Sequence, residues 1–207
     1  MTSKDEFELP DDKQLIIVIS GLSGAGKDSV VEAMVRKGLL FRFVVTATSR
    51  EKREDEVDGR DYYFISKEEF ERMIEADELL EHATVYGEYK GVPRKELERA
   101  LASGEDVVLR LDVQGAATVK QEMRNALLIF ITVESEEDLR QRLRKRHTET
   151  AEELEKRIAK AREEVKCIDT FDYVVVNRED ELDQSVDIIQ AIIKAEHHRV
   201  QPGKAAS

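Results

Sequence analysis

Residues 15–27 have the sequence LIIVISGLSGAGK, a continuous apolar run followed at once by a glycine-rich turn. The run Leu15–Ile19 is rich in β-branched residues and is typical of a strand that is buried on both faces of a parallel sheet. Gly21, Gly26 and Lys27 match the pattern G-x-x-x-x-G-K, and an amphipathic segment follows them. A strand before this pattern and a helix after it are the context in which it forms a phosphate-binding loop.

In such a loop, the glycines allow successive backbone N–H groups to face a polyphosphate, and the helix N-terminus adds a positive dipole. The lysine can then reach the β- and γ-phosphates of a nucleoside triphosphate. The alternative is a plain glycine-rich turn with a surface lysine, which the context and the spacing together disfavour. The residues predicted to bind the triphosphate are Gly21, Leu22, Ser23, Gly24, Ala25, Gly26, Lys27, Asp28 and Ser29.

Asp28 departs from the motif at its last position. The residue after the lysine is usually Ser or Thr, whose hydroxyl binds Mg²⁺, and Ser29 could be a displaced substitute. A carboxylate is also a hard oxygen ligand suited to Mg²⁺, although it brings a negative charge close to the triphosphate. We therefore predict Asp28 and Ser29 as metal ligands and expect the coordination of the metal to differ from the usual one.

Strand and helix patterns alternate along most of the remaining sequence, which predicts an α/β fold with a parallel sheet covered by helices on both faces. Strands are expected at Leu15–Ile19, Phe43–Val45, Val107–Leu111, Leu127–Val133 and Tyr173–Val176. Helices are expected at Ser29–Lys37, from Ser66, from Pro93 to Gly104, from Ser135 to about Lys145, from Thr150 to about Val165, and at 182–195.

Between residues 46 and 92 the pattern changes to short polar elements, and we interpret this stretch as an insertion over the sheet. The sequence therefore predicts one domain over residues 14–200. Its parts are a core of residues 14–45 and 93–200 and the insertion, with flexible tails at 1–13 and 201–207.

Composition excludes several classes of function. The chain has 207 residues, of which 38% are charged, and a formal net charge of −12, which argues against non-specific binding to nucleic acid or to an anionic membrane. The single cysteine, Cys167, excludes an intramolecular disulfide and a cysteine-based metal cluster. Residues 1–12 resemble neither a signal peptide nor an arginine-rich transit peptide. We expect a cytoplasmic protein, or a mature plastid or mitochondrial form that has already been trimmed.

Two arginines lie three residues apart in the predicted insertion, with a tyrosine nearby. Arg50 and Arg53 could clamp one dianionic phosphate by forked hydrogen bonds, with help from Tyr62. An exposed charged loop is the alternative, and composition alone does not decide between the two.

Several segments together resemble the guanylate kinase family, from about Leu15 to Ala195. Ser49 to Tyr62 is similar to the family's T-x-R-x-x-R-x-x-E-x-x-G-x-D-Y stretch. The other matching segments are LLEHATVYGEYKGVP at 79–93, DVQG at 112–115 and RHTET at 146–150, the last similar to the family's R-G-T-E-T lid. The segments VVTATSR, YGEYKGVPR and VVLRLDVQGAA most resemble the cyanobacterial and plant organellar branch of the family.

The resemblance implies a P-loop nucleoside-monophosphate kinase fold with an inserted GMP-binding subdomain and a short helical lid at about 136–165. It implies ATP-dependent phosphorylation of GMP, and of dGMP, with Mg²⁺ accompanying ATP. The implied partners are these small-molecule substrates, with no nucleic acid and no membrane, and the chain is expected to be a monomer.

The resemblance also implies the roles of individual residues. Glu81 would accept hydrogen bonds from the guanine N1–H and N2 amine, with Thr46 near the base. Asp112 would lie near GMP and the metal, and Asn177 would touch the adenine. The implied ligands of the GMP phosphate are Arg50, Arg53, Tyr62 and Lys90, and the implied catalytic residues are Lys27, Arg50, Arg142, Arg146 and Arg157.

Three further positions depart from the family pattern. Lys90 replaces a usual tyrosine, Val92 replaces a Ser or Thr that bonds to the base, and Arg110 stands where many members have an aspartate near the metal. A catalytically silent binding module with the same fold is an alternative, but such modules typically lose the phosphate loop, which is intact here. A nucleic-acid-binding helix at Arg140–Arg146 is another, which its acidic flanks disfavour.

Overall fold

The computed structural model of the chain describes residues 13–85, 87–145 and 151–200. Its main sheet has five parallel strands in the order β2-β7-β1-β8-β9. The predicted parallel sheet is therefore confirmed, with the strand that precedes the glycine-rich turn at its centre. The strands are β1 (Ile16–Gly21), β2 (Arg42–Phe43), β7 (Val107–Arg110), β8 (Leu127–Thr132) and β9 (Tyr173–Val176).

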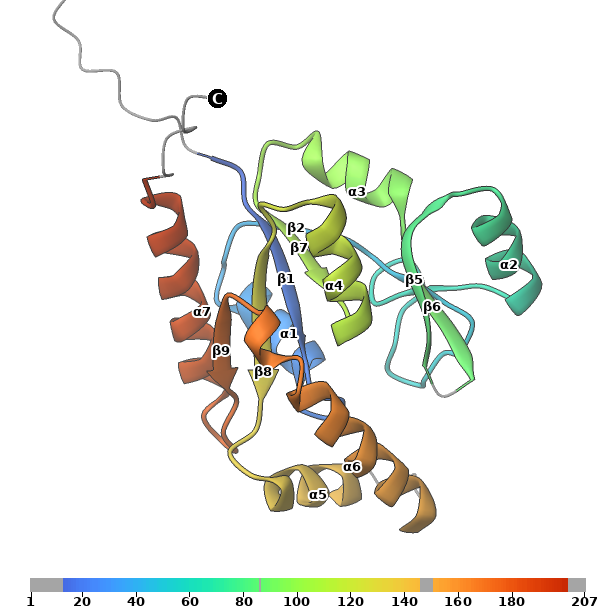
Figure 1. Cartoon of the computed structure of the whole chain (residues 1–207). Coiled ribbons are helices and arrows are strands. Elements are labelled where there is room, and N and C mark those ends of the chain that lie inside the picture. The colour runs from blue at the N-terminus through green and yellow to red at the C-terminus, as the bar shows by residue number, and fades with distance from the viewer. Residues whose placement is uncertain (1–12, 86, 146–150, 201–207) are drawn as a thin grey trace, which may run out of the picture.

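Helices cover both faces of the main sheet, as Figure 1 shows. Ile17 and Ile19 of β1 belong to a core cluster with α1 (Lys27–Arg36) and α7 (Leu182–His197). Ile16 and Val18, whose side chains alternate with them, belong to a second cluster on the other face. The helices that contribute to this second cluster are α3 (Arg94–Leu101) and α4 (Val113–Glu122).

Helix α4 was not predicted from the sequence. It begins after Asp112, whose Oδ1 accepts hydrogen bonds from the backbone N–H groups of Gln114 (3.1 Å) and Gly115 (2.9 Å). An aspartate in this position satisfies donors that the first turn of a helix leaves unpaired. The cap therefore places Asp112 at the carboxyl end of β7, where ligands bind in open parallel sheets.

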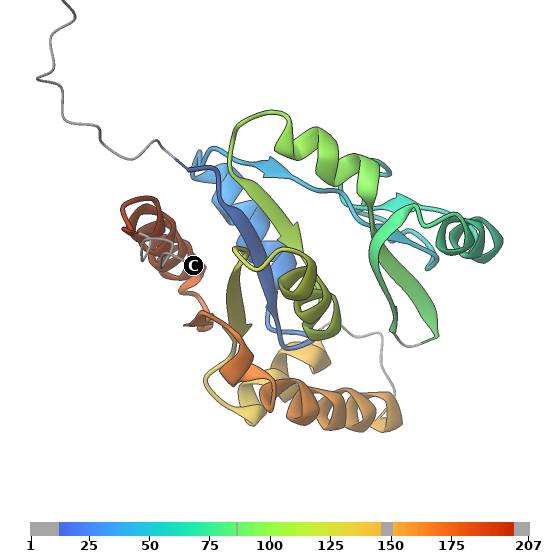
Figure 2. The same cartoon turned by 45° about the horizontal axis from the view of Figure 1, so that its top comes forward.

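A second, four-stranded sheet lies beside the core, in the order β4-β3-β6-β5. In both Figure 1 and Figure 2 it lies on one side of the main sheet together with α2. Ala47, Phe70 and Leu79 form a small core of its own. The sheet falls in the stretch interpreted as an insertion, whose boundaries stay a prediction. The elements are β3 (Ala47–Thr48), β4 (Tyr63–Phe64), α2 (Lys67–Glu75), β5 (Leu79–Val85) and β6 (Glu88–Pro93).

Helices α5 (Glu136–Lys145) and α6 (Ala151–Val165) follow β8 and occupy the region expected to form a lid. Leu139 and Leu143 of α5, and Leu154 and Ile158 of α6, are buried in the same cluster as α1 and α7. The lid helices therefore pack on the core through apolar side chains. A short 3₁₀ helix, Ile168–Thr170, connects α6 to β9.

Candidate active site: a phosphate loop facing a cluster of cations

The phosphate loop joins β1 to α1 at the carboxyl edge of the main sheet. Gly26 has φ of 88°, a conformation that favours glycine, and a Cβ there would lie 2.7 Å from Asn177 Nδ2. The backbone N–H of Leu22 donates to the Ile131 carbonyl (3.0 Å), which ties the loop to β8. The glycine at position 26 thus meets both a backbone and a packing requirement.

Lys27 folds back on the loop that precedes it. Its Nζ donates to the carbonyl oxygens of Gly21 (2.8 Å) and Leu22 (3.0 Å). Burial lowers the pKa of Lys27 to about 8, although the nearby carboxylates of Glu164 and Asp28 oppose this shift. Burial has removed part of the water that would stabilise this ammonium. A polyphosphate that enters the loop therefore stabilises it strongly, because the anion replaces the lost hydration with a negative charge.

Glu164 on α6 contacts the loop directly. Its Oε2 accepts a hydrogen bond from the backbone N–H of Ser23 (2.8 Å), and the residue is only 4% exposed. Burial raises the pKa of Glu164, against the effect of the hydrogen bond from Ser23 and of the Lys27 charge. The carboxylate therefore accepts a hydrogen bond from one of the loop N–H groups that would otherwise face a phosphate oxygen.

Arg142 and Asn177 support the loop from the lid and from the end of β9. Arg142 Nη2 donates to the Asn177 carbonyl (2.6 Å), and Asn177 Nδ2 donates to the Ala25 carbonyl (2.8 Å). Arg142 Nη1 also donates to Ala25 (3.3 Å). In this structure the two side chains bind the protein backbone, so their predicted roles, at the phosphoryl group and at adenine, stay predictions.

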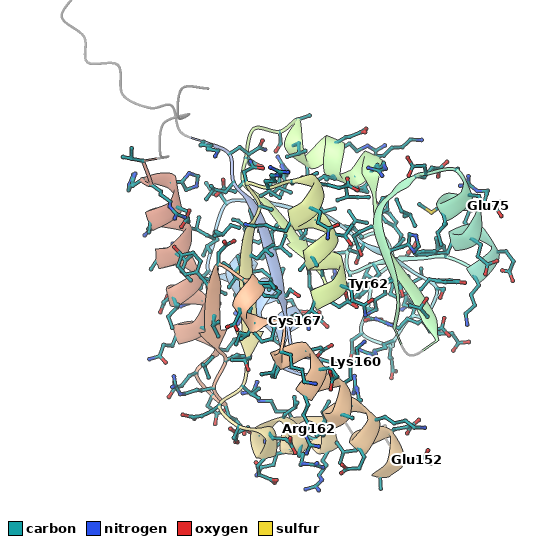
Figure 3. All side chains as sticks on the ribbon, viewed as in Figure 1. Tyr62, Glu75, Glu152, Lys160, Arg162 and Cys167 are labelled. Atoms are coloured by element: carbon teal, nitrogen blue, oxygen red, sulfur yellow. The ribbon has the colours of Figure 1, made fainter. Side chains whose placement is uncertain are left out.

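Tyr62 is surrounded by cations where the insertion meets the core, at the position labelled in Figure 3. Its ring centroid lies 4.6 Å from Arg110 Cζ, 5.0 Å from Arg50 Cζ and 5.5 Å from Lys90 Nζ. Burial raises the pKa of Tyr62, so the phenol remains a neutral hydrogen-bond donor. Positive charges around a buried donor form an environment that suits a phosphate.

Arg50 is oriented by a carboxylate that sequence reasoning did not assign to the site. Both of its Nη atoms donate to Glu56, one of them at 2.7 Å. Partial burial opposes ionisation of Glu56, but the hydrogen bond from Arg50 and that from the Arg53 N–H hold its pKa at about 2. Glu56 is therefore ionised at neutral pH and fixes the guanidinium over Tyr62. In the sequence, Glu56 follows Arg50 and Arg53 at the spacing of the R-x-x-R-x-x-E motif, and this spacing could have indicated its role.

Glu81 is a buried carboxylate in the same pocket. It is 5% exposed, and burial together with the nearby Asp112 charge raises its pKa to about 8. A Cβ on Gly115 would lie 2.6 Å from Glu81 Oε2, so only glycine at that position leaves room for the carboxylate. A carboxylate that is costly to ionise in the unliganded protein is suited to a ligand that brings two N–H donors.

Two side-chain oxygen atoms of residues that line this pocket, Thr46 Oγ1 and Asp112 Oδ2, are buried without a hydrogen-bond partner among the described residues. Buried polar groups are normally paired, so both atoms fit contacts to a ligand. No group of three or more His, Cys, Asp or Glu side chains within the described residues could hold a metal ion. That finding is compatible with Mg²⁺, which usually binds one or two carboxylates together with substrate phosphates and water.

One pocket brings most of the predicted residues together from the core, the insertion and α6. Ser29 is exposed on α1 and does not line this pocket, whereas Val92 is fully buried in the core. Arg146 lies outside the described residues. The predicted residues in the lining are Ser23, Gly24, Gly26, Lys27, Asp28, Thr46, Arg50, Arg53, Tyr62, Glu81, Lys90, Asp112 and Arg157.

Sequence reasoning missed two lining residues of α6, Lys160 and Glu164. Figure 3 labels Lys160, on the helix that bounds the pocket opposite Tyr62. Glu164 had a signal in the sequence, because it continues the buried face formed by Leu154, Ile158 and Ala161. A carboxylate at a position where the helical period expects an apolar residue indicates a buried polar contact.

A phosphate loop after the central strand of a parallel sheet, in one pocket with a cluster of cations, is the arrangement of a phosphate-loop nucleoside-monophosphate kinase. The sequence matches the guanylate kinase family over residues 13–196. The chain belongs to the guanylate kinase family.

Two relatives illustrate the match. Guanylate kinase 2, chloroplastic/mitochondrial, of Oryza sativa subsp. japonica is 52% identical over 200 residues, which are 96% of this chain and 70% of the relative. The guanylate kinase of Caldanaerobacter subterraneus subsp. tengcongensis is 46% identical over 190 residues, which are 92% of this chain and 91% of the relative. The family resemblance predicted from the sequence motifs is confirmed.

Solved structures agree with this family. The crystal structure of guanylate kinase from Anaplasma phagocytophilum aligns with a TM-score of 0.74 at 32% identity, over 90% of this chain and 88% of that one. Shikimate kinase from Bacteroides thetaiotaomicron aligns with a TM-score of 0.50 at 20% identity, over 87% of this chain and 98% of that one, which is a likeness of fold alone. The predicted fold class is therefore confirmed.

Proposed function

We propose that this chain is an enzyme that transfers the γ-phosphoryl group of ATP to the phosphate of GMP, and of dGMP, giving ADP and the nucleoside diphosphate. The observation that supports GMP is Glu81, a buried carboxylate beside the Tyr62 cations. Guanine presents N1–H and an N2 amine to one carboxylate, whereas adenine N1 would meet it with a lone pair. A site built to pair with substrate donors rejects an analogue without them.

The residues of this chain act by positioning and by stabilising charge, which is most of what phosphoryl transfer requires. Arg50, Arg53, Tyr62 and Lys90 place the GMP phosphate so that one of its oxygens faces the γ-phosphorus. Lys27 binds the oxygens between the β- and γ-phosphates and stabilises the negative charge on the departing ADP.

The lid supplies further positive charge. Arg157 of α6 lines the pocket, and Arg142 of α5 donates a hydrogen bond to the phosphate loop. Arg146 falls between the two helices, outside the described residues, and its catalytic role stays a prediction. With both substrates bound, these arginines would converge on the transferred group and exclude water.

Magnesium is the metal we propose to accompany ATP. Asp112 would hold it through Oδ2, which has no hydrogen-bond partner among the described residues. The other predicted ligands are Asp28, whose Oδ1 pairs with Arg110, and Ser29, which is exposed and does not line the pocket. When bound, Mg²⁺ neutralises charge on the β- and γ-phosphates. Asp112 also fixes the start of α4, so one oxygen positions the helix while the other is available to a ligand.

The small molecules ATP and GMP are the proposed partners. None of the helices described, over 13–85, 87–145 and 151–200, is long and apolar enough to cross a membrane. A monomeric state, and residence in the cytoplasm or in a plastid or mitochondrion, stay predictions. The rice relative is named for the two organelles.

The test is a substrate panel of GMP, dGMP, AMP, UMP and CMP with ATP and Mg²⁺, following the release of ADP. We expect GMP and dGMP to be phosphorylated and GMP to exceed AMP in kcat/KM by about 10⁴-fold. Lys27→Ala serves as the inactive control, with turnover reduced by at least about 10²-fold and an unchanged melting temperature. Similar efficiency on GMP and AMP would leave a monophosphate kinase without the proposed base preference, and no turnover of any substrate would favour a silent binding module.

A further inference from the structure

Arg110 is a buried cation at the carboxyl end of β7, next to the central strand. Its side chain is 8% exposed, and its Nη1 lies 3.1 Å from Asp28 Oδ1, in the first turn of α1. Burying a guanidinium is costly unless a counter-charge and hydrogen bonds accompany it. Its Nε is in fact buried without a partner among the described residues. The ion pair with Asp28, whose side chain is 44% exposed, is one of the contacts that compensate for the burial of Arg110.

The same guanidinium contacts the loop that carries Tyr62. Arg110 Nη2 donates to the Asp61 carbonyl (2.9 Å), and its Cζ lies 4.6 Å from the Tyr62 ring centroid. The Phe43 ring centroid lies 5.3 Å from the same Cζ. One side chain thus connects three parts of the site: the helix after the phosphate loop, the main sheet and the loop of the insertion that would bind the acceptor phosphate.

Asp28 and Arg110 are both departures from the family pattern, and the structure places them in contact. An aspartate where a hydroxyl is usual adds a negative charge near both phosphates, and an arginine where an aspartate is usual adds a positive one. Because the two charges are adjacent, they largely cancel in the field felt by a phosphate. Each departure is therefore tolerated in the presence of the other.

We propose that Arg110 is a positioning residue for the acceptor phosphate, and that it acts with Asp28 as one unit. The pair fixes the Tyr62 loop relative to the phosphate loop and keeps the Asp28 charge from repelling the phosphate of GMP. Arg110 does not itself contact the phosphate. The inference rests on the proposed function, since GMP is taken as the acceptor.

A double-mutant cycle on GMP binding tests the proposal. The proteins are wild type, Arg110→Gln, Asp28→Ser and the double variant, titrated with GMP by calorimetry without ATP or Mg²⁺. Arg110→Gln should raise the Kd for GMP about tenfold in the wild-type background, because it leaves the Asp28 charge uncompensated and releases the Tyr62 loop. In the Asp28→Ser background the same substitution should raise it by no more than about threefold.

Arg99→Gln is the matched control, because Arg99 forms an exposed ion pair with Glu96 on α3 and does not line the pocket. It should leave the Kd unchanged. If Arg110→Gln does not fold, Arg110→Lys in both backgrounds completes the cycle. The lysine keeps the positive charge beside Asp28 but loses the planar guanidinium. The increase in the Kd for GMP that Arg110→Lys causes should again be larger when Asp28 is present.

Two results would overturn the proposal. An equal or larger loss in the Asp28→Ser background would mean that Arg110 binds the phosphate itself. No loss in the wild-type background would mean that the pair is structural only. Both differ from failure of the proposed function, which would appear as weak GMP binding by wild type or as comparable turnover of GMP and AMP.

Discussion

The role proposed for Glu81 in recognising guanine comes with a cost to the unliganded protein. Its pKa in the folded chain is raised from its ordinary value of 4.5 to about 8, first by burial and then by Asp112. A carboxyl group whose pKa is raised by folding contributes stability that is complete below its unfolded pKa and is lost as pH rises through the folded pKa. As the pH rises from about 4.5 to 8, Glu81 ionises in the unfolded chain but stays largely protonated in the folded one, so the unliganded protein loses stability.

Glu81→Gln should consequently raise the melting temperature of the unliganded protein at pH 8 and change it little at pH 5. Each 1 kcal/mol corresponds to roughly 2–4 °C in a domain of this size. Thermal unfolding at the two pH values measures the effect, with Glu75→Gln, on the exposed face of α2, as the control. A variant that gains the same stability at both pH values would contradict the assignment of the raised pKa to Glu81.

The same pKa predicts how GMP binding depends on pH. Guanine donors favour the ionised carboxylate, so binding should release a proton and the affinity for GMP should increase from about pH 7 to pH 8, above the pKa of about 6 at which a phosphate monoester titrates. Calorimetry in buffers of different ionisation enthalpy would detect the released proton. In Glu81→Gln this pH dependence should disappear, and kcat/KM for GMP should fall by about 100-fold or more, because the amide NH₂ opposes the guanine donors. Retention of the pH dependence would assign it to another group.

At the scale of single elements, the insertion has a small core that is separate from those of the main sheet. Phe70 of α2 is fully buried in it and stacks on Tyr89, with ring centroids 5.1 Å apart. The elements around this core include β3; Thr46 immediately precedes this strand, and Arg50 follows it by two residues. Packing within the insertion therefore controls the geometry of the acceptor side of the site.

Phe70→Ala should destabilise the insertion, since removal of a buried phenylalanine side chain costs about 3–5 kcal/mol. We expect a higher KM for GMP, nearly unchanged binding of an ATP analogue, and faster hydrogen exchange confined to residues 46–93. Phe130→Ala, in the main core, is the comparison and should affect both nucleotides. Equal weakening of ATP-analogue and GMP binding by Phe70→Ala would contradict the separation of the two cores.

Helix α6 bears pocket residues on one side and exposed ion pairs on the other. Arg157 lines the pocket, whereas Lys156, one residue earlier, pairs with Glu152 at the surface (2.8 Å). Arg157→Ala should lower kcat by about 100-fold with little change in GMP affinity, because its charge matters most when the phosphoryl group is in transfer. Lys156→Ala should leave both unchanged. Lost GMP affinity at unchanged kcat would make Arg157 a binding residue only.

At the scale of the whole molecule, residues of the core, the insertion and helix α6 line one pocket. Several cations face this pocket from different elements, and some of them already pair with carboxylates, such as Arg110 with Asp28. The two substrates would bind to different parts, so both are needed to neutralise the charges on all sides. The cationic side chains in the lining are Lys27, Arg50, Arg53, Lys90, Arg110, Arg157 and Lys160.

We therefore expect the radius of gyration, measured by small-angle X-ray scattering, to decrease more with GMP and a non-hydrolysable ATP analogue together than with either alone. Closure over both substrates would exclude water from the phosphoryl group. The control is Lys27→Ala, in which the contraction caused by the ATP analogue should be reduced. Equal contraction with GMP alone would place closure entirely on the acceptor side.

Local patterns were sufficient to predict the main sheet and the phosphate loop. The apolar run before Gly21 and the spacing from Gly21 to Lys27 are properties of adjacent residues, and their consequences for backbone conformation are also local. The strands at β7, β8 and β9 were predicted for the same reason. The strand predicted at Phe43–Val45 is present as the shorter β2, which ends at Phe43. The helix α4 that Asp112 caps was not predicted, because packing against the sheet defines this helix more than its own sequence pattern does.

The sequence by itself determined the fold class, the family and the residue types of the site, since these depend on periodicity and on ordered motifs. Only the tertiary structure decided which charges meet. Glu164 contacts Ser23, and Arg110 pairs with Asp28, although each pair is far apart in the sequence. The burial that raises the pKa of Glu81 likewise depends on packing against distant residues such as Gly115. Charge interactions and desolvation depend on distance and burial in space, and no local sequence pattern encodes either quantity.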